Sequence, residues 1–321
     1  MAKKPIISII IPCYNVSRFI RETINSILLQ NRIDRCELVL VDDASTDNSL
    51  EILLEYNIID NVKIVQSSVN GGVAVARNIG IREAKGEFIM FLDADDEISS
   101  GAIELLMEKI TPELDVLSFG FRIIDKDKSS NCSNSTFDNR LFTSKEFLKS
   151  YFRRSLLQHI CSQIIRKDLI DNNFIEFISN TYYAEDQEFQ MKVLYYAKNI
   201  LYIKDELFIY NRGKGATMNS GFNIKRFSVL DVFQRMLILF NEDKELFYYY
   251  KNYALYNYYS FLRDSTKAEF DFNDNHLREY KILSGLKPSL IFDSKLAWTV
   301  ICLNSIDRIS HKALIQIFKL L

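Results

Sequence analysis

The first third of the chain alternates short apolar runs with amphipathic segments. Runs rich in β-branched and aromatic residues lie at residues 6–11, 37–41, 62–65 and 88–92. Continuous runs of this kind are typical of parallel strands that are covered on both faces of a sheet. Between the first two runs, apolar residues recur at helical spacing, at Ile20, Ile24 and Ile27. We therefore expect residues 6–110 to form an α/β domain with a mostly parallel sheet flanked by helices.

Polar residues directly follow three of these runs. The first run ends at Pro12-Cys13-Tyr14-Asn15, the second at Asp42-Asp43 and the fourth at Asp93-Ala94-Asp95-Asp96. Ligands of parallel sheets bind outside the carboxyl ends of the strands, which is where these residues are expected. Residues two apart in an extended chain point to the same side, so Asp93 and Asp95 should share one face. Carboxylate oxygens suit Mg²⁺ or Mn²⁺ bound together with the phosphates of a substrate.

The same polar residues have a structural alternative, which is helix capping. Ser17 precedes the first helical pattern, residues 44–47 precede the second, and Asp96, Ser99 and Ser100 precede a third at residues 102–109. Side-chain oxygens at such positions accept hydrogen bonds from the first N–H groups of a helix. On these residues alone, a metal site and a set of caps both remain open.

The first turn contains no glycine-rich phosphate loop. A dinucleotide site needs G-x-G-x-x-G after the first strand, and a P-loop needs G-x-x-x-x-G-K-[ST]. Residues 12–15 contain no glycine, which argues against both classes of nucleotide site. The strand ends instead offer Tyr14 for stacking on a base and Asp43 for accepting a base N–H.

Composition narrows the range of partners. The chain has 40 Lys and Arg against 42 Asp and Glu, and this balance gives no field that would attract nucleic acid. Its five cysteines are scattered without a CxxC pair, which indicates a reducing compartment and neither a disulfide framework nor a zinc site. We expect no signal peptide, and no apolar run reaches the roughly 18 residues of a spanning helix. The expectation is a cytoplasmic protein with at most peripheral membrane contact.

The pattern changes beyond residue 110. Strands are expected at residues 115–121, 160–166 and 207–211, a polar loop at 125–139, and helices at 143–157 and from Glu185. From residue 222 the chain is helical and aromatic, and most of its tyrosines are expected to be packing residues. We expect one domain at residues 1–220, with a donor half at 1–110 and an acceptor half at 111–220, and a helical region at 221–321.

Glu185 and Asp186 open the predicted helix near the end of the domain. The free N–H groups and the macrodipole stabilise carboxylates in a first helical turn, so a structural role would suffice for both. The chemistry of sugar transfer suggests a second role for this pair of carboxylates. A glycosidase needs two carboxyl groups, whereas a nucleoside diphosphate leaves as a metal-stabilised anion. An inverting sugar transferase therefore needs only one base, which takes the proton of the acceptor hydroxyl.

Taken together, the motifs resemble one family. Ile-Ile-Ile-Pro-Cys-Tyr-Asn, Leu-Val-Asp-Asp-Ala-Ser-Thr-Asp, Asn-Gly-Gly with Ala-Arg-Asn-Ile-Gly, and the run from Gly86 to Asp96 follow one another. This order resembles the family 2 glycosyltransferases of the GT-A fold, strongly over roughly residues 1–100 and more weakly to residue 220. The resemblance implies a Rossmann-like sheet and a metal-dependent, inverting hexosyl transfer. The donor would be a UDP-sugar, the acceptor a carbohydrate hydroxyl and the metal Mn²⁺ or Mg²⁺.

The resemblance also implies a donor site. Its residues would be Pro12, Tyr14, Asn15, Asp42, Asp43, Arg77, Asp93, Ala94 and Arg212. Among them, Pro12, Tyr14 and Asp43 would line the uridine pocket, and Arg77 would lie near the diphosphate. Arg77 has an alternative as a surface salt-bridge residue, and Arg212 as part of a surface loop.

The same resemblance implies the metal ligands and the catalytic residues. The metal ligands would be Asp93, Asp95 and Asp96. Asp95 would be the main ligand, Asp186 would be the base and Glu185 would orient the acceptor. One departure is Gln163, which stands where relatives often carry a lysine.

The family favours a step in bacterial surface polysaccharide synthesis, such as O-antigen, capsule or lipooligosaccharide, on a lipid-linked acceptor. Two other functions stay open. A non-catalytic sugar-nucleotide or glycan-binding module is disfavoured by the intact acids, and a sugar nucleotidyltransferase by the missing glycine-rich loop. The tail from Lys281 combines basic residues with an apolar side, which suits a membrane surface or a homodimer contact.

Overall fold

The computed structural model describes residues 4–125, 128–131, 137–214 and 222–268, together with residues 283, 286, 287 and 303. The chain divides into two compact units. The first takes residues 1–147, 157–180 and 185–219, and the second takes residues 148–156, 181–184 and 220–321. Apart from those four single residues, the tail for which a membrane or dimer contact is expected lies outside the described part of the chain.

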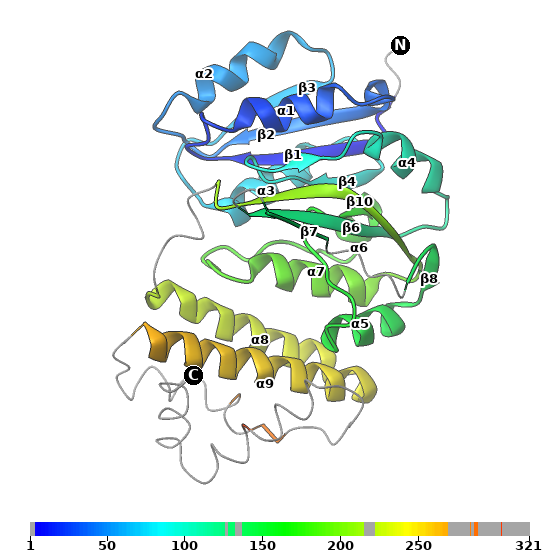
Figure 1. Cartoon of the computed structure of the whole chain (residues 1–321), viewed down its shortest axis with the longest axis vertical. Coiled ribbons are helices and arrows are strands. Elements are labelled where there is room, and N and C mark those ends of the chain that lie inside the picture. The colour runs from blue at the N-terminus through cyan, green and yellow to red at the C-terminus, as the bar shows by residue number, and fades with distance from the viewer. Residues whose placement is uncertain are drawn as a thin grey trace. The chain divides into compact units, whose positions relative to one another are not determined.

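The first unit is built on one sheet of ten described strands (Figure 1). They are β1 (Ile7–Cys13), β2 (Cys36–Asp42), β3 (Val62–Gln66), β4 (Phe88–Phe91), β5 (Glu97–Ile98), β6 (Val116–Asp125), β7 (Lys128–Asn131), β8 (Arg140–Phe142), β9 (Gln163–Arg166) and β10 (Ile200–Arg212). Their order is β3-β2-β1-β4-β9-β6-β10-β5, with β7 beside β6 and β8 beside β10. The first four pair in parallel, as the alternating pattern predicts, and β6 pairs in parallel with β10. Antiparallel β9 joins these two groups.

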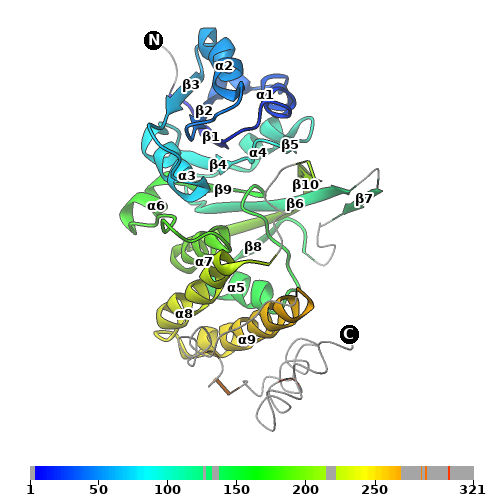
Figure 2. The same cartoon turned by 90° about the vertical axis from the view of Figure 1, so that its left-hand side faces the viewer.

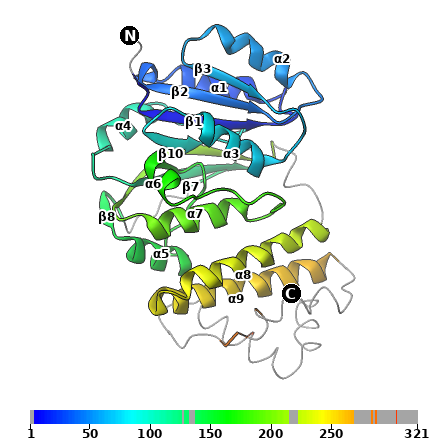
Figure 3. The same cartoon turned by 180° about the vertical axis from the view of Figure 1, so that it is seen from behind.

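Helices cover both faces of this sheet. Those of the first unit are α1 (Ile20–Leu28), α2 (Ser49–Leu54), α3 (Val73–Glu83), α4 (Ala102–Lys109), α6 (Lys167–Asn172) and α7 (Glu185–Tyr196), and α5 (Ser144–Phe152) contains a boundary between the units. Short 3₁₀ turns lie at Ile33–Arg35, Glu55–Ile58 and Ile224–Phe227. In Figures 2 and 3, α1 and α4 lie over one face of the sheet, and α3 and α6 over the other. Every residue of β2 and β4 is buried, which explains their continuous apolar sequences.

The structure contradicts two capping alternatives and one loop. Helices α1 and α4 have Phe19 and Gly101 at their N-caps, and neither helix has a side-chain cap. The expected caps, Ser17 for α1 and Asp96, Ser99 and Ser100 for α4, therefore do not form. The polar segment at residues 125–139, expected as a loop, contributes β7, which pairs with β6. The acids after β4 are thus free of a capping role.

Glycine at position 80 lets α3 lie directly against β1. A Cβ atom added at Gly80 would lie 2.2 Å from Cγ2 of Ile10. We expect Gly80→Ala to lower the free energy of unfolding, measured in urea, by about 1–3 kcal/mol, the usual cost of overpacking. Adding Ile10→Ala should recover part of this loss because the clashing methyl is gone. Strictly additive losses would contradict the steric explanation.

The second unit is centred on two helices, α8 (Ser228–Phe240) and α9 (Lys244–Lys267), which lie side by side (Figure 1). Asp243 caps α9 by accepting hydrogen bonds from the N–H groups of Glu245 and Leu246. The ring of Phe152 lies 5.2 Å from both Phe240 and Tyr250. Four tyrosines of α9 are buried, at positions 250, 253, 258 and 259, which confirms their expected packing role. Among the described residues, no helix combines the length and apolar character needed to cross a membrane.

Candidate active site

The turns after β1 and β2 are tied together by one side chain. Asn15 has φ 54° and places its Oδ1 where it accepts hydrogen bonds from the N–H groups of Thr46, at 2.8 Å, and Asp47, at 3.2 Å. Tyr14, directly before it, is 47% exposed. Pro12 is the sixth residue of β1 rather than part of a turn after it. Tyr14 is therefore the aromatic ring that this edge of the sheet presents to a ligand.

Asp43 shapes a neighbouring turn. Its two carboxylate oxygens accept the N–H groups of Gly71, at 2.9 Å, and Gly72, at 2.7 Å. Gly72 has φ 82°, in the left-handed region that favours glycine. Asp43 and Asp42 are both buried. The Asn-Gly-Gly motif and the second aspartate pair thus form one unit, with the carboxylate of Asp43 holding the turn before α3.

Arg77 connects two other segments of the site. Its side chain is 4% exposed, and its guanidinium donates to Asp93 Oδ1 at 2.7 Å and to Glu185 Oε1 at 3.2 Å. The same group lies over the ring of Phe177, 5.4 Å from the centroid. A guanidinium can bridge two carboxylates because its donors lie in a rigid plane. This burial contradicts the surface salt-bridge alternative, and Arg77 joins the end of β4 to the start of α7.

Exposure alternates along the acidic loop after β4. Asp93 and Asp95 are partly exposed, whereas Ala94 and Asp96 are buried. Residues 93–96 form a turn, in which the N–H of Asp96 donates to the carbonyl oxygen of Asp93 at 3.1 Å, so the extended chain from which a common face was expected for Asp93 and Asp95 is not present. Thr23 of α1 holds the loop by donating to the carbonyl oxygen of Ala94 at 2.8 Å. Burial acts to raise the pKa of Asp93, but Arg77 outweighs it and holds that pKa below its ordinary value.

Asp96 faces inward and meets Asn211 of β10. Its Oδ1 accepts the backbone N–H of Asn211 at 2.8 Å, and the Asn211 amide donates to the carbonyl oxygen of Asp95 at 3.2 Å. Among the described residues, Asp96 Oδ2 has no hydrogen-bond partner. Burial, together with the charges of Asp93 and Asp95, raises the pKa of Asp96 to about 9. Asn211 thus ties β10 to the acidic loop.

The first turn of α7 carries the two expected catalytic acids. Glu185 accepts from Arg77, and burial and the neighbouring charge of Asp186 raise the pKa of Glu185 to about 7. Asp186 is partly exposed, and its Oδ1 accepts the N–H of Gln187 at 2.7 Å. Ala184 has φ 63°, a rare conformation for a residue with a side chain, directly before the pair. The helix start therefore presents one carboxylate bound to Arg77 and one, Asp186, that accepts the N–H of Gln187.

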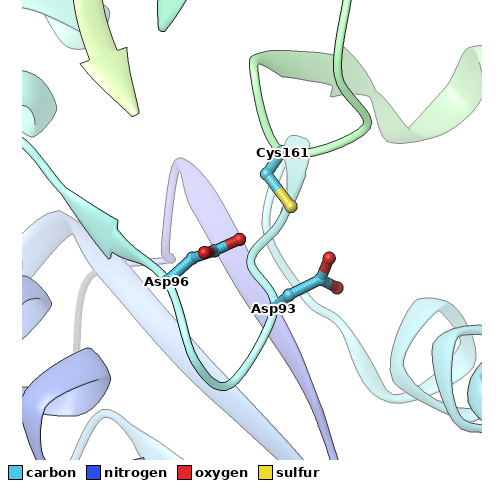
Figure 4. Close-up of side chains that lie close together, drawn as sticks. All are labelled: Asp93, Asp96 and Cys161. Carbon is cyan, nitrogen blue, oxygen red and sulfur yellow. The ribbon is translucent and has the colours of Figure 1, made fainter. Parts of the chain in front are cut away.

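Two site residues were not expected from the sequence, His159 and Cys161. His159 stacks on Phe208 with ring centroids 5.0 Å apart, and its Nδ1 accepts the N–H of Cys161 at 3.2 Å. Burial lowers the pKa of His159, while Asp93 and Asp186 oppose this. Figure 4 shows Cys161 beside Asp93 and Asp96. Neither residue belongs to a spaced motif, so only the fold brings them to the acids.

Two other residues lie apart from the acids. Arg212, expected near the diphosphate, is exposed and lies 3.8 Å from Asp125, with both side chains 47% exposed. Gln163, in the position where relatives often carry lysine, is fully buried and accepts from the amide of Gln158 at 2.6 Å. Gln163 therefore belongs to the protein interior.

The acidic loop suits a hard divalent cation. Mg²⁺ and Mn²⁺ take oxygen ligands and commonly use one or two carboxylates together with substrate phosphates. Asp93 and Asp95 supply two partly exposed carboxylates in this loop. Their oxygens are of the type that such a metal takes as ligands.

Comparisons with known proteins identify the family. Residues 8–174 match the family described as Glycosyl transferase family 2. EpsJ of Bacillus subtilis, an uncharacterized glycosyltransferase, is 32% identical over 210 residues, which are 64% of this chain and 61% of EpsJ. Glycosyltransferase GlyG of Streptococcus pneumoniae is 28% identical over 253 residues, 72% of this chain and 79% of GlyG.

A solved structure shares the fold. Staphylococcus aureus TarS, residues 1–349 in complex with UDP-GlcNAc, matches with a TM-score of 0.66 at 24% identity, covering 87% of this chain and 80% of that one. The mixed sheet with flanking helices is thus the GT-A architecture expected from the motifs. The chain spans less than two thirds of EpsJ, and the family match covers more than half of this chain. This protein belongs to glycosyl transferase family 2.

Proposed function

We propose that this protein moves a sugar from a UDP-sugar to a carbohydrate hydroxyl with inversion at the anomeric carbon. Three observations support this: the family, the partly exposed acids after β4, and the second acid pair at the start of α7. The observation that carries the proposal is Arg77, which contacts Asp93 on one side and Glu185 on the other. One guanidinium thus links the expected donor side to the expected acceptor side.

The donor would lie along the ends of β1, β2 and β4. Tyr14 would stack on the uracil ring, and Pro12 and Asp43 would line the same pocket, with Asn15 and Asp42 maintaining its turns. Asp93 and Asp95 would hold Mg²⁺ or Mn²⁺ against the diphosphate. Bound there, the metal would neutralise the charge that develops on the leaving UDP.

Asp186 would act as the base. An inverting transfer needs one carboxylate that takes the proton of the acceptor hydroxyl as the new glycosidic bond forms. Asp186 is partly exposed, while Glu185 is bound to Arg77. Glu185 would therefore orient the acceptor, and Asp186 would receive the proton.

The acceptor would be a lipid-linked oligosaccharide of a bacterial surface polysaccharide, at the cytoplasmic side of the membrane. Staphylococcus aureus TarS is 31% identical over 67% of this chain and 37% of its own length. Its name, poly(ribitol-phosphate) beta-N-acetylglucosaminyltransferase, supports a cell-surface glycan as the acceptor. Of the alternatives, a binding module would not need the acid pair of α7. A nucleotidyltransferase would need a phosphate loop that the first turn lacks.

The test is release of UDP from a panel of UDP-sugars, with and without a carbohydrate acceptor. A transferase should need the acceptor for its full rate. Chelation of divalent metal should slow release by roughly a hundredfold or more, because the metal supplies several kcal/mol of charge stabilisation, and Mn²⁺ or Mg²⁺ should restore it. A binding module would release nothing, and a nucleotidyltransferase would consume UTP instead.

A further inference from the structure

A buried thiol lies beside two of the acids, and the proposed transfer does not use it. Cys161 precedes β9, whereas Asp93 and Asp96 follow β4. One carboxylate oxygen of each acid and the Sγ atom of Cys161 all lie within 4.8 Å of one another. In Figure 4 the three side chains of these two segments lie close together, with the Asp96 carboxylate directed toward the side where Cys161 and Asp93 lie. The grouping is therefore a product of the fold.

Asp96 supplies an independent sign of a ligand. It is fully buried, and Oδ1 accepts the N–H of Asn211 at 2.8 Å. Its other oxygen, Oδ2, has no hydrogen-bond partner within the described part of the chain. A buried carboxylate oxygen without a partner costs free energy that a bound cation would recover. Figure 4 shows this carboxylate directed toward the side of the loop where Cys161 and Asp93 lie.

We propose that Asp93, Asp96 and Cys161 form a binding site for Zn²⁺. Thiolate and carboxylate are both zinc ligands, whereas Mg²⁺ takes oxygen ligands and gains little from sulfur. In a tetrahedral site with zinc–ligand bonds of about 2.0–2.3 Å, two ligand atoms lie about 3.3–3.8 Å apart. The three atoms here lie within 4.8 Å, so small side-chain movements would complete the site. A water molecule would take the fourth position.

The local charges favour a divalent cation at this place. With the thiol proton lost, as zinc binding requires, the three ligands carry three negative charges. Arg77, 2.7 Å from Asp93, supplies one positive charge. Zn²⁺ would supply two further positive charges to these ligands.

The zinc site differs from the proposed donor metal site in its ligands. The donor metal would use the partly exposed Asp93 and Asp95. Zinc would use the inward-facing Asp96 and the buried thiol, and the two sites would share Asp93. Zinc would therefore inhibit the transferase. This last consequence rests on the proposed function, whereas zinc binding does not.

The test is calorimetric titration of the untagged full chain with Zn²⁺. The parent should bind with an affinity that falls at least roughly tenfold in Cys161→Ser and in Asp96→Asn, the smallest loss expected for a ligand. Cys36→Ser is the matched control, because Cys36 is also buried but begins β2, at the opposite end of the strand from the acids. It should bind Zn²⁺ as the parent does. Circular dichroism should show each variant folded.

A second probe separates sulfur ligation from binding to oxygens alone. Cd²⁺ should give a thiolate-to-metal absorption band with the parent and with Cys36→Ser, but not with Cys161→Ser. Equal Zn²⁺ affinity of Cys161→Ser and parent, or no Zn²⁺ binding by the folded parent, would overturn the proposal. If Zn²⁺ binds as expected but no UDP-sugar is turned over, the transferase proposal fails and the zinc site stands.

Discussion

Replacing Asp186 by asparagine is expected to abolish sugar transfer and to leave donor binding intact. Asparagine has nearly the same shape but cannot take a proton, and a general base contributes roughly 10²–10⁴-fold to a rate. The turnover number should fall by that factor with the acceptor present. The dissociation constant for UDP, measured by calorimetry with Mn²⁺, should stay within a factor of about two, since the donor would lie at the ends of β1, β2 and β4.

Asp168→Asn is a matched control for this experiment. Asp168 also lies in the first turn of a helix, α6, and is exposed. The same substitution there removes a favourable interaction with a helix dipole, at a cost of about 0.3–1 kcal/mol, without touching the acids. It should transfer sugar at the parent rate. Parent-like transfer by Asp186→Asn would remove Asp186 as the base, and equal loss in both variants would indicate a general effect on stability.

The sequence was sufficient for the succession and the parallel pairing of the first four strands. The runs before residues 12, 42 and 93 are apolar because the strands are covered on both faces, and parallel pairing then brings their ends to one edge. The acidic loop is different: Asp96 donates its N–H to the carbonyl oxygen of Asp93, so residues 93–96 form a turn and their placement does not follow from the geometry of extended chain. Local pattern thus determined the strands but not the turn that carries the acids.

What the sequence did not predict depends on contacts between distant segments. The residues around Arg77 in the sequence do not indicate that it bridges Asp93 and Glu185. Residues 77 and 185 are far apart in the chain and meet only in the folded sheet, in which β9 lies between β4 and β6. Cys161 reaches the acids through the same strand. Asp96 caps no helix, and its Oδ1 instead accepts the N–H of Asn211, a partner that is available only in the folded sheet. Residue type and spacing along the chain do not indicate which distant segments will be in contact in the folded protein.

Arg77→Met is expected to destabilise the protein by about 3 kcal/mol at neutral pH. Removing one partner of a buried ion pair leaves the other charge uncompensated, at a cost of roughly 3–5 kcal/mol, and the lower end applies because Asp93 keeps 29% of its side chain exposed. Urea unfolding of parent and variant would measure the difference. Arg77→Lys, which keeps the charge but lacks the planar fork, should lose less.

The pH dependence of this loss identifies its cause. In the parent, Arg77 holds the pKa of Asp93 below its ordinary value, so the ion pair stabilises the fold above that value and is lost as pH falls. In Arg77→Met the folded-state pKa of Asp93 should rise from its lowered value, and that of Glu185 should rise above about 7. Both acids of the variant can then take protons on folding. The loss of folding free energy relative to the parent should therefore be largest above pH 7, and it should shrink as the pH falls toward 4 and the two acids become neutral. A loss that is the same at every pH would mean that Arg77 acts through packing against Phe177 alone, and the link between the two sides of the site would not be electrostatic.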